Sequence, residues 1–294
     1  MNLLKRVFIC SFFLISASVS ANGLDASDHY YGSDFYHTKR TLKESSLKRA
    51  IQKIHKSYHQ KVPGNFDTIS DGSCHAKGCY KHKVFQYRES RKHLLSSIHL
   101  EGAKNNYYIK GVYCEKNYTK SDFSRGKGPG PIQPPDHQVL NVEHTWPQSR
   151  FSSTSSHQVQ KTDLHHLYPT DSLQNSQRGS FKFAEVYTET KNTTCSQNKL
   201  GYIDPTFPAK SDHYSIYFEP TDSHKGNVAR AIFYFSVTYN IKIDAVEEHY
   251  LRKWHLEDPV DNSEIRRHEM IFTIQGSRNT FIDYPELVDQ ISNF

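Results

Sequence analysis

The sequence predicts a mixed α+β fold built as one domain. Apolar residues at helical spacing predict amphipathic helices near the start of the chain and in its last third. Between these regions, short runs of aromatic and β-branched residues predict strands. The sequence has no internal repeat, no low-complexity tract and no linker long enough to require a second domain, so we expect a single one.

The first 21 residues have the pattern of a secretory signal peptide. Lys5 and Arg6 precede an apolar run at 7–15, and small residues at 19–21 fit a cleavage site. The apolar run is shorter than the ~20 residues that a membrane-spanning helix needs, which disfavours the alternative of a membrane anchor. We therefore expect an exported protein, periplasmic or secreted, without a membrane segment after cleavage.

Removal of the signal leaves 273 of the 294 residues, a length that fits one large domain or two small ones. Lys5 and Arg6 are lost with it, so Lys+Arg falls from 37 to 35 against 31 Asp+Glu, and the net charge becomes about +4. This mildly basic balance favours anionic partners. The 18 His would add positive charge in an acidic medium.

Four of the five cysteines lie beyond the signal, and an even number in an exported chain predicts two disulfides. Cys74 and Cys79 are close enough in sequence for a local bridge, which leaves Cys114 with Cys195. The sequence does not exclude the other two pairings. A zinc site is the alternative for the first pair, and its ligands would be Cys74, His75, Cys79 and His82.

The first predicted helix covers residues 42–58. Thr41 and Glu44, three residues apart, fit a capping box at its start. Its apolar face consists of Leu47, Ile51, Ile54 and Tyr58. Residues 62–82, which contain Pro, Gly and both local cysteines, are predicted to form a loop.

Strands are predicted at 84–87, 107–113 and 139–142. Gly and Pro at 124–138 predict an exposed loop that leads into the third strand. The Ser- and Thr-rich residues 149–160 and the stretch 190–212 are also predicted to be loops.

Helices dominate the rest of the prediction. Pro169 disfavours a helix interior at 163–169, whereas Thr170 or Asp171 can cap a following helix that contains Asn175 and Arg178. Three further helices are predicted at 226–239, 245–255 and 263–275. The apolar stripe of the first of them consists of Val228, Ile232, Phe235 and Tyr239. Trp146 and Trp254 are predicted to be core residues.

The most informative local feature is Glu143 directly before His144 at the end of a predicted strand. A carboxylate can hold a divalent cation, and a histidine can take a proton from water; together they are the minimal apparatus for hydrolysing a phosphodiester. Asn175 offers a second oxygen ligand in the following helix. One carboxylate and one amide suit Mg²⁺, which keeps several waters and leaves room for phosphate oxygens.

The chain resembles the bacterial endonuclease I family of exported nucleases, which belongs to the ββα-metal (His-Me finger) group. The first matching segments are Asn141-Val142-Glu143-His144-Thr145-Trp146-Pro147-Gln148-Ser149 and Asp163-Leu164-His165-His166-Leu167-Tyr168-Pro169-Thr170-Asp171, continued by Asn175 and Arg178-Gly179. The later ones are Lys225-Gly226-Asn227-Val228-Ala229-Arg230-Ala231, Trp254-His255 with Asp258-Pro259-Val260, and Gln275-Gly276-Ser277-Arg278-Asn279 with Phe281-Ile282-Asp283. The resemblance extends over roughly residues 30–290, and five ordered motifs are far more specific than any single one.

The resemblance implies a role for each matched residue. His144 matches the general base of the family, and Glu143 and Asn175 match its metal ligands, which usually hold Mg²⁺. The family cleaves DNA, and often RNA, with little sequence preference. We accordingly expect a ββα-metal nuclease domain at 22–294, a monomer that acts on DNA and RNA; the preference between the two is left open.

Two departures from the family pattern stand out. Some members carry a phosphate-stabilising arginine on a longer insert, but only 18 residues separate His144 from Asp163 here, so that arginine has no clear counterpart. Ser277 and Thr280 stand where members often have Asn and Pro. Arg178, three residues after Asn175 and hence on the same helical face, is the candidate for the missing arginine; a surface ion pair is its alternative.

Other residues are assigned by the same reasoning. Arg230 is expected to point away from its helix's apolar stripe toward nucleic acid or solvent, and Arg278, Lys182 and Lys225 are further candidates for holding substrate. Asp163 is expected to fix local backbone. His165 or His166 is expected to orient a loop.

Two rival functions remain open from the sequence. The first is a zinc hydrolase that uses His144, His165 and His166. The second is a basic exported protein that binds nucleic acid without cleaving it.

Overall fold

The computed structural model describes residues 26–124, 126–191, 195–208 and 213–294. The predicted signal peptide at 1–21 therefore lies outside the described residues. The helices are α1 (Ala26–Thr38), α2 (Glu44–Lys56), α3 (Tyr87–His93), α4 (His157–Thr162), α5 (Ser172–Arg178), α6 (Lys225–Tyr239), α7 (Ala245–Glu257), α8 (Asn262–Gln275) and α9 (Thr280–Asp283). In the described part of the chain, no helix is both long and apolar enough to cross a membrane.

The strands are short and form four small antiparallel or mixed sheets. They are β1 (Tyr58–Gln60), β2 (Thr68–Ser70), β3 (Cys79–Tyr80), β4 (Tyr108–Lys110), β5 (Asn117–Thr119), β6 (Leu140–His144), β7 (Leu167–Asp171), β8 (Lys182–Phe183), β9 (Thr188–Lys191), β10 (Lys199–Tyr202) and β11 (Tyr217–Glu219). The sheet orders are β2-β1-β3, β4-β5, β6-β7 and β8-β11-β10-β9. The predicted α+β class is confirmed.

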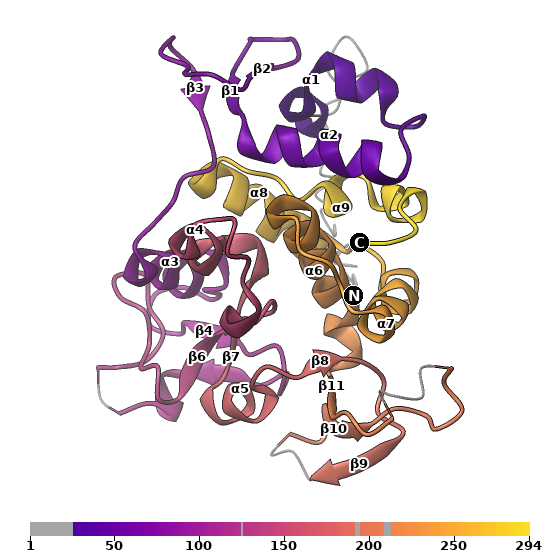
Figure 1. Ribbon diagram of the computed structural model, residues 1–294. Helices are drawn as coiled ribbons and strands as arrows, with labels where there is room; N and C mark the ends of the chain where they lie inside the picture. The colour runs from indigo at the N-terminus through magenta and orange to yellow at the C-terminus, as the bar shows by residue number, and fades with distance from the viewer. Residues whose placement is uncertain (1–25, 125, 192–194, 209–212) are drawn as a thin grey trace, which may run out of the picture.

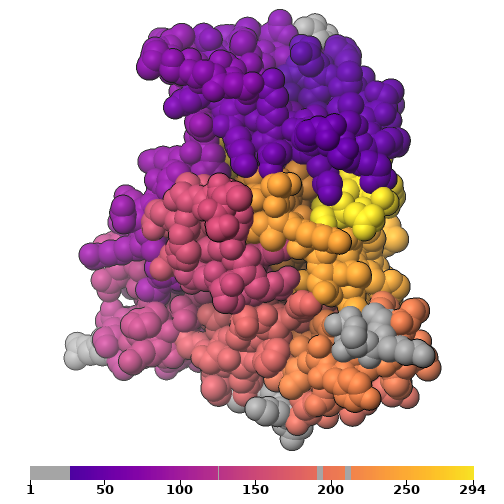
Figure 2. Space-filling model, viewed as in Figure 1, coloured from indigo at the N-terminus to yellow at the C-terminus, as the bar shows by residue number. Residues whose placement is uncertain are grey.

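Helix α6 is the centre of the molecule. Every one of its residues except Asn227 is buried, as expected of a helix surrounded by protein. In Figure 1, α7, α8 and α9 lie around it, α1 and α2 cover one end, and the β8–β11 sheet lies at the other. Figure 2 shows the N-terminal segments as a continuous cap over that first end. The β6–β7 hairpin and α5 form a separate edge beside this helical core.

The helices α6, α7 and α8 confirm the three predicted at 226–239, 245–255 and 263–275. Trp146 and Trp254 are buried in the core as predicted. The disulfides Cys74–Cys79 and Cys114–Cys195 resolve the pairing, and the zinc alternative at the first pair is thereby wrong.

The predicted start of the first helix is wrong. Helix α2 begins at Glu44 rather than at 42, and Lys43 rather than Thr41 is the residue before it. The Glu44 carboxylate instead accepts hydrogen bonds from the backbone N (3.0 Å) and Oγ (2.9 Å) of Ser292 near the C-terminus. Tyr58 lies beyond the helix, in β1. The Glu44 carboxylate, which a local helix cap would use, thus binds a residue far away in the sequence.

Several predicted strands and loops are also corrected. Residues 84–86 are not a strand, and α3 begins at Tyr87 because the Glu89 carboxylate accepts a hydrogen bond from the Gln86 backbone N at 2.9 Å and caps the helix. The strand expected at 107–113 is limited to β4, and the one at 139–142 is displaced to β6, which includes Glu143 and His144. The stretch 149–160 runs into α4, and 190–212 contains β10. The loop at 124–138 is irregular as predicted, residue 125 aside.

Candidate active site

A β-hairpin followed by a helix brings the predicted residues together. β6 pairs antiparallel with β7, and Glu143 lies opposite Tyr168. Helix α5 follows β7 at once because the Asp171 side chain caps it, accepting hydrogen bonds from the backbone N of Leu173 (2.8 Å) and of Gln174 (3.1 Å). The helix turns back along β6, and this return places Asn175 beside Glu143.

Glu143 is a buried carboxylate with one engaged oxygen. Its side chain is 2% exposed, and Oε1 accepts a hydrogen bond from the Tyr113 hydroxyl at 2.8 Å and lies 3.0 Å from Arg178 Nη1. Burial raises the pKa of Glu143, while the Arg178 charge and the Tyr113 hydrogen bond oppose that rise. Oε2 accepts no hydrogen bond from the described residues, so it is the oxygen left for a ligand.

His144 is held in one orientation and one tautomer. Its Nε2 lies 3.1 Å from the backbone carbonyl oxygen of Lys161 in α4. Because a carbonyl oxygen only accepts, Nε2 carries the proton and Nδ1 carries the lone pair. Burial lowers the pKa of His144 to about 3. The imidazole is therefore neutral near pH 7 and able to accept a proton at Nδ1.

The amide of Asn175 is oriented in the same way. Its Nδ2 donates a hydrogen bond to the backbone carbonyl of Val142 at 3.1 Å, which leaves the amide oxygen Oδ1 free of this contact. Glu143, His144 and Asn175 line one cavity of about 350 Å³. Two hard oxygen donors, Glu143 Oε2 and Asn175 Oδ1, are thus available beside a neutral histidine.

The structure corrects the expectation for Arg178. The side chain is 1% exposed, so neither a surface ion pair nor a free phosphate clamp describes it. Besides its contact with Glu143, Nη1 donates to the His144 carbonyl at 3.2 Å and Nη2 donates to the Thr145 carbonyl at 2.8 Å. Arg178 therefore positions Glu143 and the end of β6.

Two other cations predicted to hold substrate are buried in ion pairs instead. Arg230 is 1% exposed, and its Nη2 lies 2.6 Å from Glu264 Oε2, so the expectation that it faces nucleic acid or solvent is wrong. Arg278 is 2% exposed and binds Asp283 (2.7 Å) and Glu269 (2.5 Å). Both guanidiniums join segments of the helical core, where a phosphate has no access.

The two lysine candidates differ. Lys225 is buried between Glu219 (2.8 Å) and Asp222 (2.7 Å) and is likewise unavailable. Lys182 remains partly exposed, although its Nζ lies 2.6 Å from Asp244 Oδ2. Lys182 is not among the residues that line the cavity. Its role in holding substrate stays a prediction.

Asp163 and the two adjacent histidines are structural in their contacts. The Asp163 carboxylate accepts hydrogen bonds from the hydroxyls of Tyr234 (2.9 Å) and Tyr239 (2.8 Å) and from the His165 backbone N (3.1 Å). His165 Nε2 donates to the Ser277 carbonyl (3.0 Å), and His166 Nε2 donates to the Gln160 carbonyl (2.8 Å).

The proposed zinc set of His144, His165 and His166 is not assembled. Each Nε2 faces a different backbone carbonyl. Within the described ranges, the side chains that do converge as potential ligands are those of His268, Glu269 and Asp283. The Arg278 guanidinium binds both carboxylates of that group, so it is an ion-pair cluster.

Sequence reasoning missed three residues that shape the site. Tyr113 binds Glu143 across 30 positions, Lys161 supplies the carbonyl that orients His144, and the Tyr87 ring stacks on the His144 ring. A hydrogen bond between distant residues leaves no local sequence pattern, so the sequence contained no signal that could have identified Tyr113. The cationic stretch around Tyr87, at 81–92, was a signal that charge patterning could have found.

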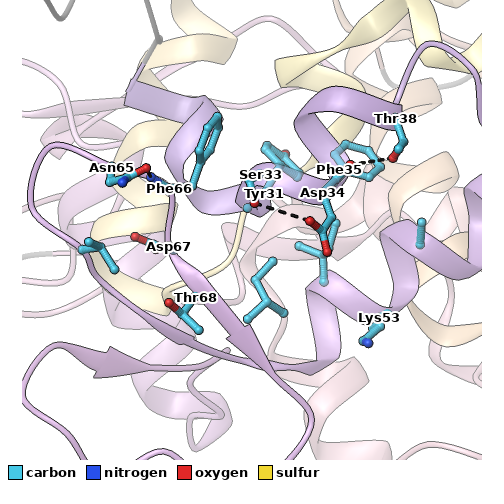
Figure 3. A pocket seen from close by; sticks show the side chains of 15 residues that line it. Tyr31, Ser33, Asp34, Phe35, Thr38, Lys53, Asn65, Phe66, Asp67 and Thr68 are labelled. Atoms are coloured by element: carbon cyan, nitrogen blue, oxygen red, sulfur yellow. Dashed lines mark hydrogen bonds between the residues drawn. The ribbon is translucent and has the colours of Figure 1, made fainter. Parts of the chain in front are cut away.

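Another cavity, of about 580 Å³, lies between α1, α2 and β2, remote from these residues (Figure 3). Two of its charged side chains are engaged in structural contacts. Lys53 Nζ lies 3.2 Å from Asp71 Oδ2, and the Asp67 carboxylate accepts a hydrogen bond from the Tyr80 hydroxyl. We assign no chemistry to this cavity.

Comparison with known proteins gives one family. Residues 74–286 match the family model described as Endonuclease I. An extracellular ribonuclease of Bacillus amyloliquefaciens is 32% identical over 196 residues, which is 59% of this chain and 59% of that protein. An Endonuclease-1 of Buchnera aphidicola is 29% identical (43% of this chain, 48% of its own), and an extracellular deoxyribonuclease of Aeromonas hydrophila is 26% identical (41% and 48%). The chain thus spans less than two thirds of the length of each of these relatives.

Proposed function

Because the chain belongs to the Endonuclease I family, we propose that it is a metal-dependent endonuclease that hydrolyses phosphodiester bonds, with β6, β7 and α5 as its ββα-metal core. One observation carries the proposal. Glu143 Oε2 and Asn175 Oδ1 form no hydrogen bonds with the residues that the structure describes, and they lie in the cavity where His144 is held neutral with its Nε2 bonded to the Lys161 carbonyl. That arrangement supplies two oxygen ligands and a base in one place.

The donor set fits a hard cation. A carboxylate oxygen and an amide oxygen suit Mg²⁺ or a similar ion and leave positions for water and phosphate. Glu143 and Asn175 would hold it. When bound, the cation would stabilise negative charge on the phosphate and on the leaving oxygen.

The protein's own groups account for the remaining chemistry. His144 Nδ1 takes the proton from the attacking water, and the Lys161 carbonyl stabilises the imidazolium through Nε2. Arg178 and Tyr113 hold Oε1 of Glu143 and so fix the direction of Oε2. The buried arginine also opposes the rise in the pKa of Glu143 that burial causes.

The substrate is nucleic acid of either kind. Relatives named as ribonuclease and deoxyribonuclease both match this chain. We propose cleavage of DNA and RNA with little sequence preference, by a monomer. The names extracellular and periplasmic among the relatives, together with two disulfides, support an exported location.

One assay tests the proposal. Purified protein and its His144→Ala and Glu143→Ala variants are incubated with plasmid DNA and with RNA, in Mg²⁺ and in EDTA. We expect cleavage by the wild type in Mg²⁺, none in EDTA, and a loss of at least about 100-fold in rate for His144→Ala, the usual contribution of a general base. Equal cleavage by wild type and His144→Ala would remove the assigned base. Binding without cleavage under every condition would favour a non-catalytic nucleic-acid-binding protein.

A further inference from the structure

The cavity alone cannot hold a polyanion. Among the residues that line it, the one with a permanent positive charge is Arg178, and that charge is buried against Glu143. Nucleic-acid binding requires cations that neutralise several phosphates. These cations must therefore lie on the rim of the cavity.

Helix α3 forms part of that rim. Its first residue, Tyr87, lines the cavity, and its ring stacks on the His144 ring with the centroids 5.7 Å apart and the planes at 27°. The Nζ of Lys161 lies 4.7 Å from the centre of the Tyr87 ring. Figure 1 shows α3 next to α4, on the side of the molecule that carries the β6–β7 hairpin. The helix thus begins at the assigned base.

The position of α3 is fixed by hydrogen bonds that join α4 to the helix and to the residue Phe85 before it. Ser90 Oγ donates to the Thr162 carbonyl at 3.3 Å, and Gln158 Nε2 donates to the Phe85 carbonyl at 2.6 Å. Phe85, just before the helix, is 2% exposed. Helix α4 also supplies the Lys161 carbonyl that orients His144. The same helix therefore positions both α3 and the proposed general base.

Helix α3 is rich in cations. It contains Arg88, Arg91 and Lys92, and a carboxylate oxygen of its one acidic residue, Glu89, accepts a hydrogen bond from the Gln86 backbone N at 2.9 Å. Arg88 and Lys92 are exposed. Across the described residues, neither of these two nor Lys161 has a carboxylate within ion-pair distance, in contrast to Arg178, Arg230, Arg278 and Lys225.

We propose that Arg88 and Lys92 of α3, together with Lys161 of α4, bind the phosphates next to the one that is cleaved; this inference rests on the proposed function. Arg88 and Lys92 are four positions apart, so their Cβ atoms lie about 5–6 Å apart on one helical face and their long side chains reach neighbouring phosphates of one strand. Phosphate contacts fix the position of a strand without reading its bases. The rim therefore directs the strand into the cavity irrespective of sequence.

The test measures the salt dependence of binding in the absence of cleavage. In the His144→Ala background, affinity for a fluorescein-labelled DNA duplex is measured between roughly 50 and 200 mM KCl. The test variant is Arg88→Gln/Lys92→Gln. The matched control is Arg40→Gln/Arg49→Gln, which also removes two exposed cations but lies at the α1–α2 end of the molecule.

We expect the test variant to reduce the slope of log affinity against log salt by about 1.8 on duplex DNA and by about 1.4 on a single strand, because each lost phosphate contact contributes about 0.9 or 0.7. The control should keep the wild-type slope. With His144 restored, the test variant should raise KM in Mg²⁺ and keep kcat.

An unchanged slope in the test variant, or an equal fall in the control, overturns the assignment of α3. The proposed function fails in a different experiment, namely when the wild type does not cleave nucleic acid in Mg²⁺. Because the binding assay uses an inactive background, its result is independent of that failure.

Discussion

Arg178 offers the sharpest test of how the site is built. Arg178→Met removes the guanidinium but keeps an unbranched side chain of moderate length. The lost contacts are the 3.0 Å ion pair with Glu143 and the hydrogen bonds to the carbonyls of His144 and Thr145. The two charged side chains are 1% and 2% exposed, so water cannot replace the partner.

The magnitude follows from that burial. Leaving one member of a buried ion pair without its partner costs about 3–5 kcal/mol. Each carbonyl that loses a charged donor adds a cost of about 1–3 kcal/mol where water does not reach it. We expect a loss of at least about 3 kcal/mol in the free energy of unfolding, a large part of the ~5–15 kcal/mol typical of a domain. Arg178→Lys keeps the charge but not the planar fork and should lose less, about 1–2 kcal/mol.

The assay is urea unfolding at neutral pH, with the midpoint and the slope of the transition compared among wild type and both variants. The salt dependence of DNA binding is measured in the His144→Ala background for the same substitutions. We expect a lower midpoint, ordered wild type, Arg178→Lys, Arg178→Met, and an unchanged salt slope. If Arg178→Met instead unfolds at the wild-type midpoint and reduces the salt slope, Arg178 is a phosphate ligand and the positioning role assigned to it is wrong.

Two further predictions concern stability. Replacing Cys114 and Cys195 by Ser opens a loop of sequence separation 81 and should lower the free energy of unfolding by about 4–5 kcal/mol, whereas replacing Cys74 and Cys79, at separation 5, should cost about 2 kcal/mol; equal losses in urea unfolding would contradict this loop-length argument. Burial lowers the pKa of five histidines to about 3 or 4, namely His55, His144, His166, His224 and His255. Below the histidine pKa of about 6.5 in the unfolded chain, the unfolded state therefore binds more protons than the folded state. The contribution of these histidines to the free energy of unfolding is complete above that pH and falls as the pH drops toward 4, by up to about 1.4 kcal/mol per pH unit for each histidine. Urea midpoints that stay constant from neutral to mildly acidic pH would refute this prediction.

The elements that were predicted correctly have local sequence patterns. Glu143 and His144 lie at the end of a strand, Asp171 caps the helix after the next strand, and Asn175 lies in that helix. The apolar spacing that predicted α6, α7 and α8 is local as well. Local patterns survive folding because a helix or strand is defined by neighbouring residues.

Contacts between distant residues decided the rest. Glu44 binds Ser292, at a sequence separation of 248, instead of forming the expected helix cap. Arg230 binds Glu264, at a separation of 34, instead of lying exposed as expected. From the sequence alone, a charged side chain can equally well face solvent, bind substrate or pair with a buried carboxylate. The free-energy cost of burying it depends on partners that only the fold brings close to it.

The sequence by itself therefore determined the α+β class and the family resemblance, and it named the residues that we propose carry the chemistry. The tertiary structure alone decided which cations are free to meet a polyanion. It buries Arg178, Arg230 and Arg278 against carboxylates and leaves Arg88 and Lys92 exposed on α3, the helix whose first residue, Tyr87, stacks on His144. The physical reason is that ion pairing is set by three-dimensional proximity, which no local sequence pattern encodes.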